Sequence, residues 1–460
     1  MSKKHLIIEI FLLVFIFSLF TFLRFYNLDK RIIFDWDQEY LSNFLKRIIV
    51  DRDLILIGHR ATSDKGFFFG PYFEYLFVPF YIFSKMHPSG LINFIYLLNI
   101  IFFFFSYFVI KKIFNSLIAL AFLFFWAANY LFITYDTTVW APVLIPLGII
   151  FIWYSLWRIY NKSTIGNYLL LGLVLGFFTQ IHSLFFPVDL FALFFLVGLW
   201  FHNKKKFPLE IKKWLSLILA FFLYFTPLFI FDLRHNFLNS KLFISYFTGR
   251  IRGSIDIKPT LEVYGNFLKP FFFYNSIYIT LIFHFVIFSL LFYLYKKKHG
   301  FTKIFYLSSL ITWTITTITF LRYNQRPSEY YFIYLYPLIT ISLIDFFYNR
   351  LRLLLIILPI LFLLVNFSHF KKLTASSSLG LSAKEKVVFK LKEVLKGKKY
   401  NLVYDMPLGL NNGYQYLLEY YNALPSANPK NPLVILDMPA HKNDIVVGRI
   451  GIRIPPELLP

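Results

Sequence analysis

Long apolar runs recur along most of the chain, and they limit its fold more than any other feature. Runs of roughly 20 residues, the length that crosses a bilayer as a helix, follow one another from Leu6 to Phe370. Hydrophobic residues make up 58% of the 460 residues, whereas soluble domains contain roughly half. We therefore expect an integral membrane protein, an all-α polytopic bundle over residues 1–370.

The chain is strongly basic, and the placement of its basic residues indicates a membrane topology rather than a nucleic-acid partner. The net charge is +23, from 47 Lys and Arg against 24 Asp and Glu. The basic residues form short clusters between apolar runs, as they do in cytoplasmic loops. These clusters are "SKKH" at 2–5, "KK" at 111, "RIYNK" at 158, "NKKK" at 203, "KKKH" at 296 and "NRLR" at 349. Cysteine is absent, which excludes disulfides.

With these clusters on the cytoplasmic face, the sequence predicts about eleven transmembrane helices in the plasma membrane. The N-terminus is expected inside, as an uncleaved signal anchor over 6–23, because no small-residue cleavage pattern follows that run. The C-terminal domain is expected outside. The other spans are predicted near 91–110, 115–133, 140–157, 166–181, 184–201, 214–231, 271–295, 303–321, 330–347 and 353–369.

A large extracytoplasmic first loop (24–90) is expected to contain interfacial segments. Its apolar stretch 67–86 is interrupted by Gly70, Pro71, Glu74 and Pro79, so we expect it to be interfacial or re-entrant rather than a span. Residues 41–48 place Leu41, Phe44, Leu45 and Ile48 on one helical face, which predicts an amphipathic helix lying in the membrane interface.

The predicted topology collects scarce ionisable residues on the outer face. Such residues are costly at membrane depth, so those at span ends are candidates for function. In this set both signs occur: Asp35, Asp37, Glu39, Asp136 and Glu329 against Arg234, His235, Arg322 and Arg326. They are expected to line one cavity at the membrane surface. A structural alternative is equally open for the acidic trio, since Asp37, or Asp35 with Gln38, stands where a helix N-cap is expected.

The order of these motifs resembles the GT-C superfamily of polytopic glycosyltransferases. This superfamily includes protein O-mannosyltransferases, the aminoarabinose transferases of lipid A and the bacterial RgtA/B/C/D-like group. The segments that carry the resemblance span residues 24–340 in the expected order: "FDWDQEY", "LIGHRATSDKGFFFGPYFEYLFVPFY", "YDTTVWAPVLIPL", "TQIHSLFFP", "TPLFIFDLRHNFLN" and "SEYYFIYLYP".

The resemblance implies a membrane enzyme that transfers a hexosyl or pentosyl group from a polyprenyl-phosphate sugar to an acceptor on the outer face. In that family the first-loop Asp is the catalytic base and a Glu usually follows it. Asp37 matches the base, but Gln38 occupies the next position and Glu39 comes one place later. Asp35 therefore stays a rival for Asp37, and the role of Glu39 stays open.

The chemistry of this transfer assigns roles to the other outer-face residues. A carboxylate takes the proton of the attacking acceptor hydroxyl, with inversion at the sugar, and the departing phosphate needs cations rather than an acid. Arg326 and Arg234, followed by Arg322 and His235, are the predicted phosphate ligands, although arginines at span ends also anchor to lipid headgroups. His182, Asp136 and Tyr330 are further predicted substrate-binding residues.

Cofactor, acceptor and function class are less constrained by the sequence. The resemblance leaves open whether a divalent cation takes part, and the acceptor is a glycan, a lipid or a protein. Residues 371–460 are expected to form a small α/β domain, with helices around 382–400 and 411–424 and strands at "NLVYD" and "PLVILD". The main alternative is a lipid or sugar transporter or flippase, and a non-catalytic scaffold is a third reading.

Overall fold

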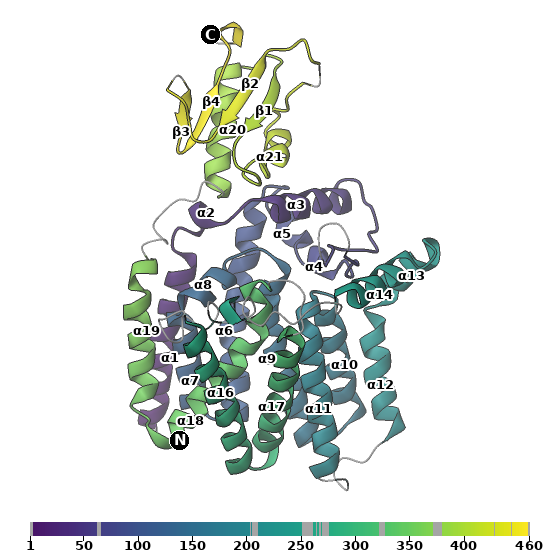
Figure 1. Ribbon diagram of the computed structural model, residues 1–460, viewed down its shortest axis with the longest axis vertical. Coiled ribbons are helices and arrows are strands. Elements are labelled where there is room, and N and C mark those ends of the chain that lie inside the picture. The colour runs from purple at the N-terminus through teal and green to yellow at the C-terminus, as the bar shows by residue number, and fades with distance from the viewer. Residues whose placement is uncertain are drawn as a thin grey trace.

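The computed structural model describes residues 3–61, 66–202, 204, 210–250, 261–263, 265, 268, 276–321, 327–370, 380–426, 428–442 and 444–458. A bundle of long helices forms the larger part, and a small α/β domain stands at one end of it (Figure 1). The N-terminus lies at the opposite end of the bundle (Figure 1). The fold thus has the two parts that the sequence predicts.

Seven helical segments in the described part of the chain are long and apolar enough to cross a membrane. They contain α1 (Lys3–Phe25), α6 (Ser89–Ile113), α9 (Ile145–Asn161), α11 (Phe186–His202), α16 (Ile277–Lys297), α17 (Gly300–Leu321) and α18 (Tyr336–Arg350). Two bent pairs raise the count to nine if each pair is one span. The predicted count of about eleven is therefore not confirmed.

Local sequence explains why two predicted spans are broken. The first pair, α7 (Ser116–Ala128) and α8 (Tyr130–Asp136), bends by 81°. Asn129 starts α8, because its side chain accepts hydrogen bonds from the backbone N–H groups of Leu131 and Phe132. The second pair, α12 (Ile211–Leu223) and α13 (Thr226–Arg234), bends by 57° where a proline occupies the first turn of α13.

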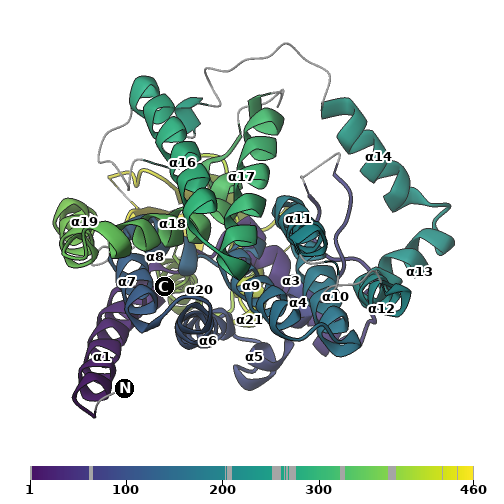
Figure 2. The same ribbon diagram turned by 90° about the horizontal axis from the view of Figure 1, so that it is seen from below.

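Two predicted spans and the interrupted stretch form shorter helices. The spans near 166–181 and 353–369 correspond to α10 (Ile165–Thr179) and α19 (Leu354–Phe370). The stretch 67–86 contains only the short helices α4 (Tyr72–Tyr75) and α5 (Val78–Phe83), in agreement with a segment that is not a single span. Beyond α13, α14 (Leu238–Arg250) lies at the periphery of the bundle, on the opposite side from α1 and α19 (Figure 2).

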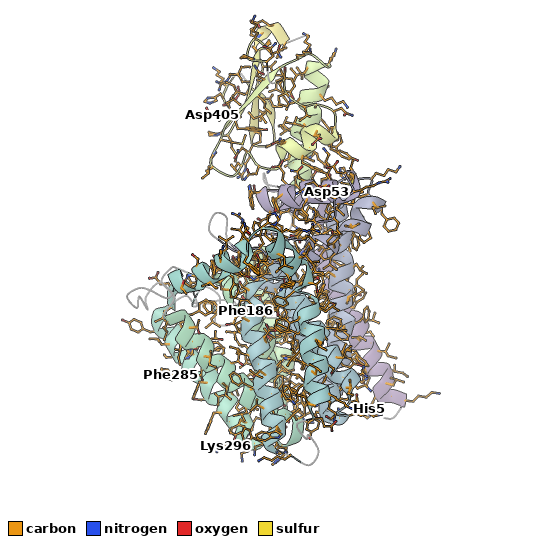
Figure 3. All side chains as sticks on the ribbon, turned by 90° about the vertical axis from the view of Figure 1, so that its right-hand side faces the viewer. His5, Asp53, Phe186, Phe285, Lys296 and Asp405 are labelled. Atoms are coloured by element: carbon orange, nitrogen blue, oxygen red, sulfur yellow. The ribbon has the colours of Figure 1, made fainter. Side chains whose placement is uncertain are left out.

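The two ends of the bundle differ in the residues they carry. His5 and Lys296 both lie at the end away from the C-terminal domain (Figure 3). In the predicted topology both residues belong to basic clusters on the cytoplasmic face. The orientation of the termini across a membrane stays a prediction.

The first loop covers the other end. After α2 (Leu28–Arg31), helix α3 (Trp36–Ile49) lies across that end, between the bundle and the C-terminal domain (Figure 1). Leu41, Phe44 and Leu45 are buried, as the predicted amphipathic pattern requires. Asp35 is the N-cap residue, and its N–H donates to the side-chain oxygen of Gln38 at 3.0 Å. Of the two N-cap positions left open by the sequence, the structure has Asp35, and Asp37 lies in the first turn.

The C-terminal domain is a four-stranded sheet with two helices. Its strand order is β1-β2-β4-β3, with β1 (Asn401–Asp405) parallel to β2 (Leu433–Asp437) and the hairpin of β3 (Ile445–Val447) and β4 (Ile450–Arg453) antiparallel. The predicted strands "NLVYD" and "PLVILD" are β1 and β2, and the predicted helices are α20 (Leu381–Leu395) and α21 (Tyr414–Tyr420). β3 and β4 were not predicted, because neither is longer than four residues.

Candidate functional site

A polar cavity of about 590 Å³ lies where the first loop meets the ends of the bundle helices. Six parts of the chain contribute to it: residues 36–41 of α3, the loop around 59–61, the stretch 68–74, the turn at 139–142, His182 and Tyr330. Its lining includes Trp36, Asp37, Tyr40, His59, Arg60, Glu74, Trp140, His182 and Tyr330. Three predicted site residues, Asp37, His182 and Tyr330, therefore meet in one cavity.

Asp37 provides the cavity with a carboxylate from the first turn of α3. Burial among protein atoms raises the pKa of Asp37, the nearby His59 lowers it and Asp35 raises it again. The side chain is nonetheless open to the cavity. In the described part of the chain no Lys or Arg forms an ion pair with it. A carboxylate with a raised pKa and no cation partner is a better proton acceptor than an ordinary Asp.

His59 and Glu74 form a pair beside Asp37 that the sequence did not single out. Glu74 Oε1 accepts from the His59 backbone N–H at 2.9 Å and lies 3.0 Å from His59 Nδ1. The Glu74 side chain is 2% exposed. A Cβ on Gly58 would lie 2.6 Å from Glu74 Oε2, so only glycine fits there. In the sequence, Glu74 stands out only as an interruption of an apolar stretch. An acid in such a stretch is itself a signal of function.

His182 is present in the cavity as a neutral ring. Burial, together with the nearby His59, lowers the pKa of His182 to about 3. Its Nδ1 accepts a hydrogen bond from the Leu184 N–H at 3.1 Å, and the ring stacks on Phe69 with a 5.9 Å centroid separation. A ring held this way offers a hydrogen bond to a ligand but no positive charge.

Tyr330 and Arg60 complete the described walls. The Tyr330 ring packs edge-on against Trp140, with centroids 4.7 Å apart. The Arg60 guanidinium lies over the Phe68 ring, 4.4 Å from its centroid. Arg60 lines the cavity but was not among the predicted residues, because it lies within the first loop and not at the end of a span.

None of the predicted phosphate ligands that the structure describes lines this cavity. Arg234 and His235 end α13, outside the cavity lining, where the His235 ring stacks on Phe231 at 4.1 Å between centroids. Both are exposed. Arg322 and Arg326 lie outside the described residues, so their prediction is neither supported nor opposed by the structure.

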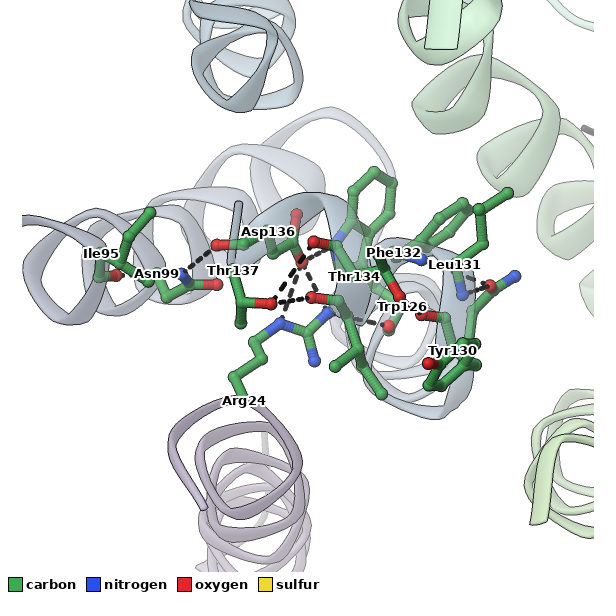
Figure 4. Close-up of polar contacts among 12 residues, drawn as sticks. Arg24, Ile95, Asn99, Trp126, Tyr130, Leu131, Phe132, Thr134, Asp136 and Thr137 are labelled. Atoms are coloured by element: carbon green, nitrogen blue, oxygen red, sulfur yellow. Dashed lines mark hydrogen bonds and ion pairs between the residues drawn. The ribbon is translucent and has the colours of Figure 1, made fainter. Parts of the chain in front are cut away.

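Asp136 lies in a separate, buried network. Its Oδ2 accepts from Arg24 Nε at 2.9 Å, from Arg24 Nη2 at 2.6 Å and from Trp126 Nε1 at 2.9 Å (Figure 4). Arg24 is 0% exposed and Asp136 7%. The Asn99 amide donates to the Asp136 backbone carbonyl. The arrangement ties α1 to the break between α7 and α8, and Asp136 is not among the residues that line the polar cavity.

Asp35 and Glu39 also have positions distinct from that of Asp37. Asp35 is half-buried at the N-cap and does not line the cavity. The Glu39 carboxylate accepts from two backbone N–H groups of the C-terminal domain, Gly413 at 2.7 Å and Tyr416 at 2.9 Å. Of the acidic trio in "FDWDQEY", only Asp37 therefore faces the cavity.

A second cavity, of about 620 Å³, adjoins the first and is mostly apolar. Phe68 lines both cavities. Polar groups occur at one side, where Asp232 accepts from the N–H groups of Asn239 and Ser240. The remaining lining is largely aromatic: Phe67, Phe69, Phe186, Phe222, Phe225, Phe229 and Phe243. Such a surface suits a hydrocarbon chain.

Grouped metal-ligand atoms occur elsewhere in the described part of the chain. Oxygen or nitrogen atoms of Asp405, Asp437 and His441 lie within 4.8 Å of one another in the C-terminal domain. Arg453 Nη2 already lies 2.8 Å from Asp437 Oδ2 and supplies positive charge there. The cavity itself presents Asp37, His59 and Glu74 as oxygen and nitrogen donors, without a comparable cluster.

A bundle of membrane-length helices, a first loop folded over one end and a small domain above that loop form the GT-C architecture predicted from the motifs. No protein-family model and no curated protein sequence matches the chain. Solved structures do, and they are GT-C glycosyltransferases. ArnT from Cupriavidus metallidurans bound to undecaprenyl phosphate is 11% identical, with a TM-score of 0.57 over 96% of this chain and 87% of that chain.

Two further structures show the same fold. ArnT in the apo state gives a TM-score of 0.58 at 11% identity, covering 95% of this chain and 97% of that one. The archaeal oligosaccharyltransferase AglB from Archaeoglobus fulgidus, in complex with an inhibitory peptide and a dolichol-phosphate, gives 0.54 at 12% identity. The match covers 93% of this chain but 61% of AglB. The chain therefore shares the GT-C fold, as its motifs predict.

Proposed function

We propose that the protein is a membrane glycosyltransferase that moves a sugar from a polyprenyl-phosphate donor to an acceptor hydroxyl on the extracytoplasmic face. The observation that carries the proposal is the position of Asp37, which pairs with no described Lys or Arg and lies in a polar cavity that shares Phe68 with a mostly apolar one. A lipid-linked sugar has the same division into polar and apolar parts. The undecaprenyl phosphate and dolichol-phosphate named for ArnT and AglB support this donor class.

In the proposed reaction Asp37 is the general base. The acceptor hydroxyl gives its proton to the Asp37 carboxylate as its oxygen forms a bond to the anomeric carbon. The bond from that carbon to the phosphate oxygen breaks, and polyprenyl phosphate leaves with the electron pair. Attack from the face opposite the phosphate inverts the anomeric configuration. The phosphate is a stable anion, so it needs no proton as it leaves.

The departing phosphate calls for positive charge and hydrogen-bond donors near the junction of the two cavities. Arg60 lies in the cavity wall next to Phe68, which lines both cavities. We therefore add Arg60 to Arg326 and Arg322 as proposed phosphate ligands. Arg234 and His235 follow Asp232, which lines the apolar cavity, and their proposed role is contact with phosphate or with lipid headgroups on that side.

Neutral groups in the cavity are proposed to orient the sugar. His182 has a pKa near 3 and so carries no charge at neutral pH. Tyr330, Trp140 and the stacked pair of Trp36 and Tyr40, whose ring planes differ by 12°, supply flat apolar surface beside the base. Rings and single hydrogen bonds of this kind suit a sugar better than a charged ligand.

The transporter alternative is less well supported by the acidic residues within the helices. Of the three acidic residues within the predicted spans, Glu9 pairs with Lys111 and Tyr107, and Asp345 pairs with Lys298 at 2.6 Å. Asp189 differs, because it accepts a hydrogen bond from the Thr179 hydroxyl at 2.8 Å and pairs with no described Lys or Arg. Carboxylates that are already paired near the basic ends of helices suit anchoring rather than an ion pathway across the membrane.

Transfer by the purified full-length protein in lipid tests the proposal. A panel of polyprenyl-phosphate sugars is offered with glycan, lipid and peptide acceptors, and release of polyprenyl phosphate is measured. We expect turnover of one donor by the wild type. The variant Asp37→Asn should lose this turnover. Its matched control is Asp53→Asn in the same loop, because Asp53 is paired with Arg47 at 3.2 Å and lies outside the cavity lining. If no donor is consumed, or if the protein only equilibrates lipid-linked sugars between leaflets, the proposal is wrong.

A further inference from the structure

The C-terminal domain is bonded to the segment that carries the proposed base. The Leu381 N–H donates to the Ile32 carbonyl at 3.0 Å, and Ile33 forms an antiparallel bridge with Gly380. Lys384 Nζ on α20 donates to the Phe34 carbonyl at 2.7 Å and also to the Asn412 carbonyl. Residues 32–34 lead directly into α3, so these bonds fix the path of the chain up to the N-cap of that helix.

Lys384 is buried, and no carboxylate of the described residues forms an ion pair with it. It is 0% exposed, and burial lowers the pKa of Lys384 to about 8, against the opposing effect of the nearby Asp35 and Glu39. Burying an ammonium is costly unless its donors are satisfied. Two backbone carbonyls accept from two of its three N–H donors here, one from each part of the protein. A salt bridge on the surface would attach the domains at lower cost, so attachment alone does not explain this lysine.

Glu39 bonds the first turn of α3, which carries Asp37, to the C-terminal domain. It stands two residues after Asp37, and two residues of an α-helix are separated by roughly 200° around the axis. Glu39 therefore faces the C-terminal domain while Asp37 faces the cavity. Its two oxygens accept from the N–H groups of Gly413 and Tyr416. Gly413 has φ +83°, and a Cβ there would lie 2.4 Å from the Phe34 carbonyl, so the close approach requires glycine.

We propose that Lys384 and Glu39 are positioning residues for Asp37, so that the C-terminal domain is a working part of the catalytic site. Lys384 fixes the chain before the N-cap, and Glu39 fixes the first turn from the face opposite the cavity. Together they hold the Asp37 carboxylate at one place in the cavity. This inference rests on the proposed function, because it assigns both residues a role in the same reaction.

The same interface offers a matched control. Lys46 on α3 pairs with Glu419 on α21, with side chains 37% and 41% exposed. This pair joins the same two parts of the protein, but Lys46 lies about two and a half turns further along α3 than the base. Replacing Glu419 weakens the attachment of the domain without loosening the turn that carries Asp37.

The experiment compares Lys384→Met, Glu39→Gln and Glu419→Gln in the full-length protein in lipid. We expect kcat to fall about 10- to 100-fold in the first two variants, since small misplacements of a catalytic group have effects of this size. KM for the donor should stay within about twofold. Glu419→Gln should keep the wild-type kcat, and Glu39→Asp should restore part of the activity lost in Glu39→Gln.

A second measurement separates positioning from folding and from the proposed function. Hydrogen exchange at the backbone amides of residues 35–40 should speed up in Lys384→Met and Glu39→Gln but not in Glu419→Gln, while amides of the bundle helices keep their protection. Unchanged exchange at 35–40, or equal loss of kcat in all three variants, would overturn the inference. A wild type without transfer, together with the expected exchange pattern, would instead refute the proposed function and leave the positioning of α3 intact.

Discussion

Asp37 and Asp136 both lie at the outer end of the bundle in the predicted topology, and the structure treats them in opposite ways. Asp136 accepts three hydrogen bonds at one oxygen from Arg24 and Trp126 and is buried. Asp37 lies open to a cavity of about 590 Å³, and no described Lys or Arg pairs with it. One carboxylate has its charge neutralised to join helices, and the other keeps its charge available.

The comparison separates two reasons for placing an ionisable group near a membrane. A buried ion pair must satisfy its own hydrogen bonds and fixes one packing arrangement. A catalytic base must keep a lone pair unengaged, and the surrounding fold has to hold it without bonding to that oxygen. For Asp37 the holding contacts come from neighbouring residues of α3, above all Glu39 and the segment before Asp35.

The largest expected effect is the loss of transfer in Asp37→Asn. Asparagine keeps the size of the side chain but cannot take a proton, so we expect kcat to fall by about 10²- to 10⁴-fold. Sugar transfer and the unfolding temperature are measured on the same sample. Transfer should be lost, and the unfolding temperature should stay near that of the wild type. A variant that retains wild-type turnover would mean that another group, with Asp35 the first candidate, is the base.

Asp136→Asn should lower the stability of the protein and leave sugar transfer nearly unchanged. Removing one partner of a buried pair leaves Arg24 uncompensated, which typically costs about 3–5 kcal/mol. We expect a clear drop in the midpoint of thermal or denaturant unfolding in detergent, with turnover per folded molecule nearly unchanged. The double variant Arg24→Met/Asp136→Asn should recover part of the stability, because it removes the unpaired charge. Normal stability with lost turnover in Asp136→Asn would place this residue in the active site after all.

The sequence predicted the helical bundle with a small sheet near the C-terminus. Among its predicted site residues, Asp37, His182 and Tyr330 line one cavity, and their roles stay predictions. The bundle could be predicted because apolar length, basic clusters and motif order are properties of the chain itself. The sequence could not show that Asp136 is paired while Asp37 is not. The partner of Asp136 is Arg24, 112 residues away, and in the sequence Arg24 appears only as a basic residue at the end of a span. Glu39 was ambiguous for the same reason: its partners are backbone N–H groups of residues 413 and 416, which have no side-chain signature.

Glu74→Gln tests the neighbour of Asp37 that the sequence did not reveal. Gln retains the shape of Glu74 and one acceptor oxygen for the His59 N–H groups, but it removes the negative charge beside the ring. We expect kcat/KM to fall about tenfold through the altered orientation of His59 near Asp37. The control is Asp29→Asn, which lies in the first loop outside the cavity lining. Identical kinetics in Glu74→Gln and the wild type would show that the pair only packs the loop.

The smallest effect concerns pH. Burial raises the pKa of Asp37 and the like charge of Asp35 adds to the rise, so the acid limb of kcat/KM should lie above the range of an ordinary Asp. Asp35→Asn keeps a good N-cap residue and removes that like charge. The acid limb should then move to lower pH, measured as the full pH profile of transfer. An unmoved limb would mean that Asp37 does not titrate in the rate-limiting step.

The same raised pKa predicts a stability effect of Asp37 with the opposite direction to its catalytic one. When the pKa is higher in the folded protein than in the unfolded chain, the ionised carboxylate costs stability at neutral pH, and that stability is regained as pH falls through the folded-state pKa. Asp37→Asn should therefore be as stable as the wild type or slightly more so at pH 7, by at most about 0.5 kcal/mol at this open position. The difference should vanish in acid. A base that is held unpaired is thus expected to reveal itself by a small gain in stability when it is removed, whereas the paired Asp136 reveals itself by a large loss.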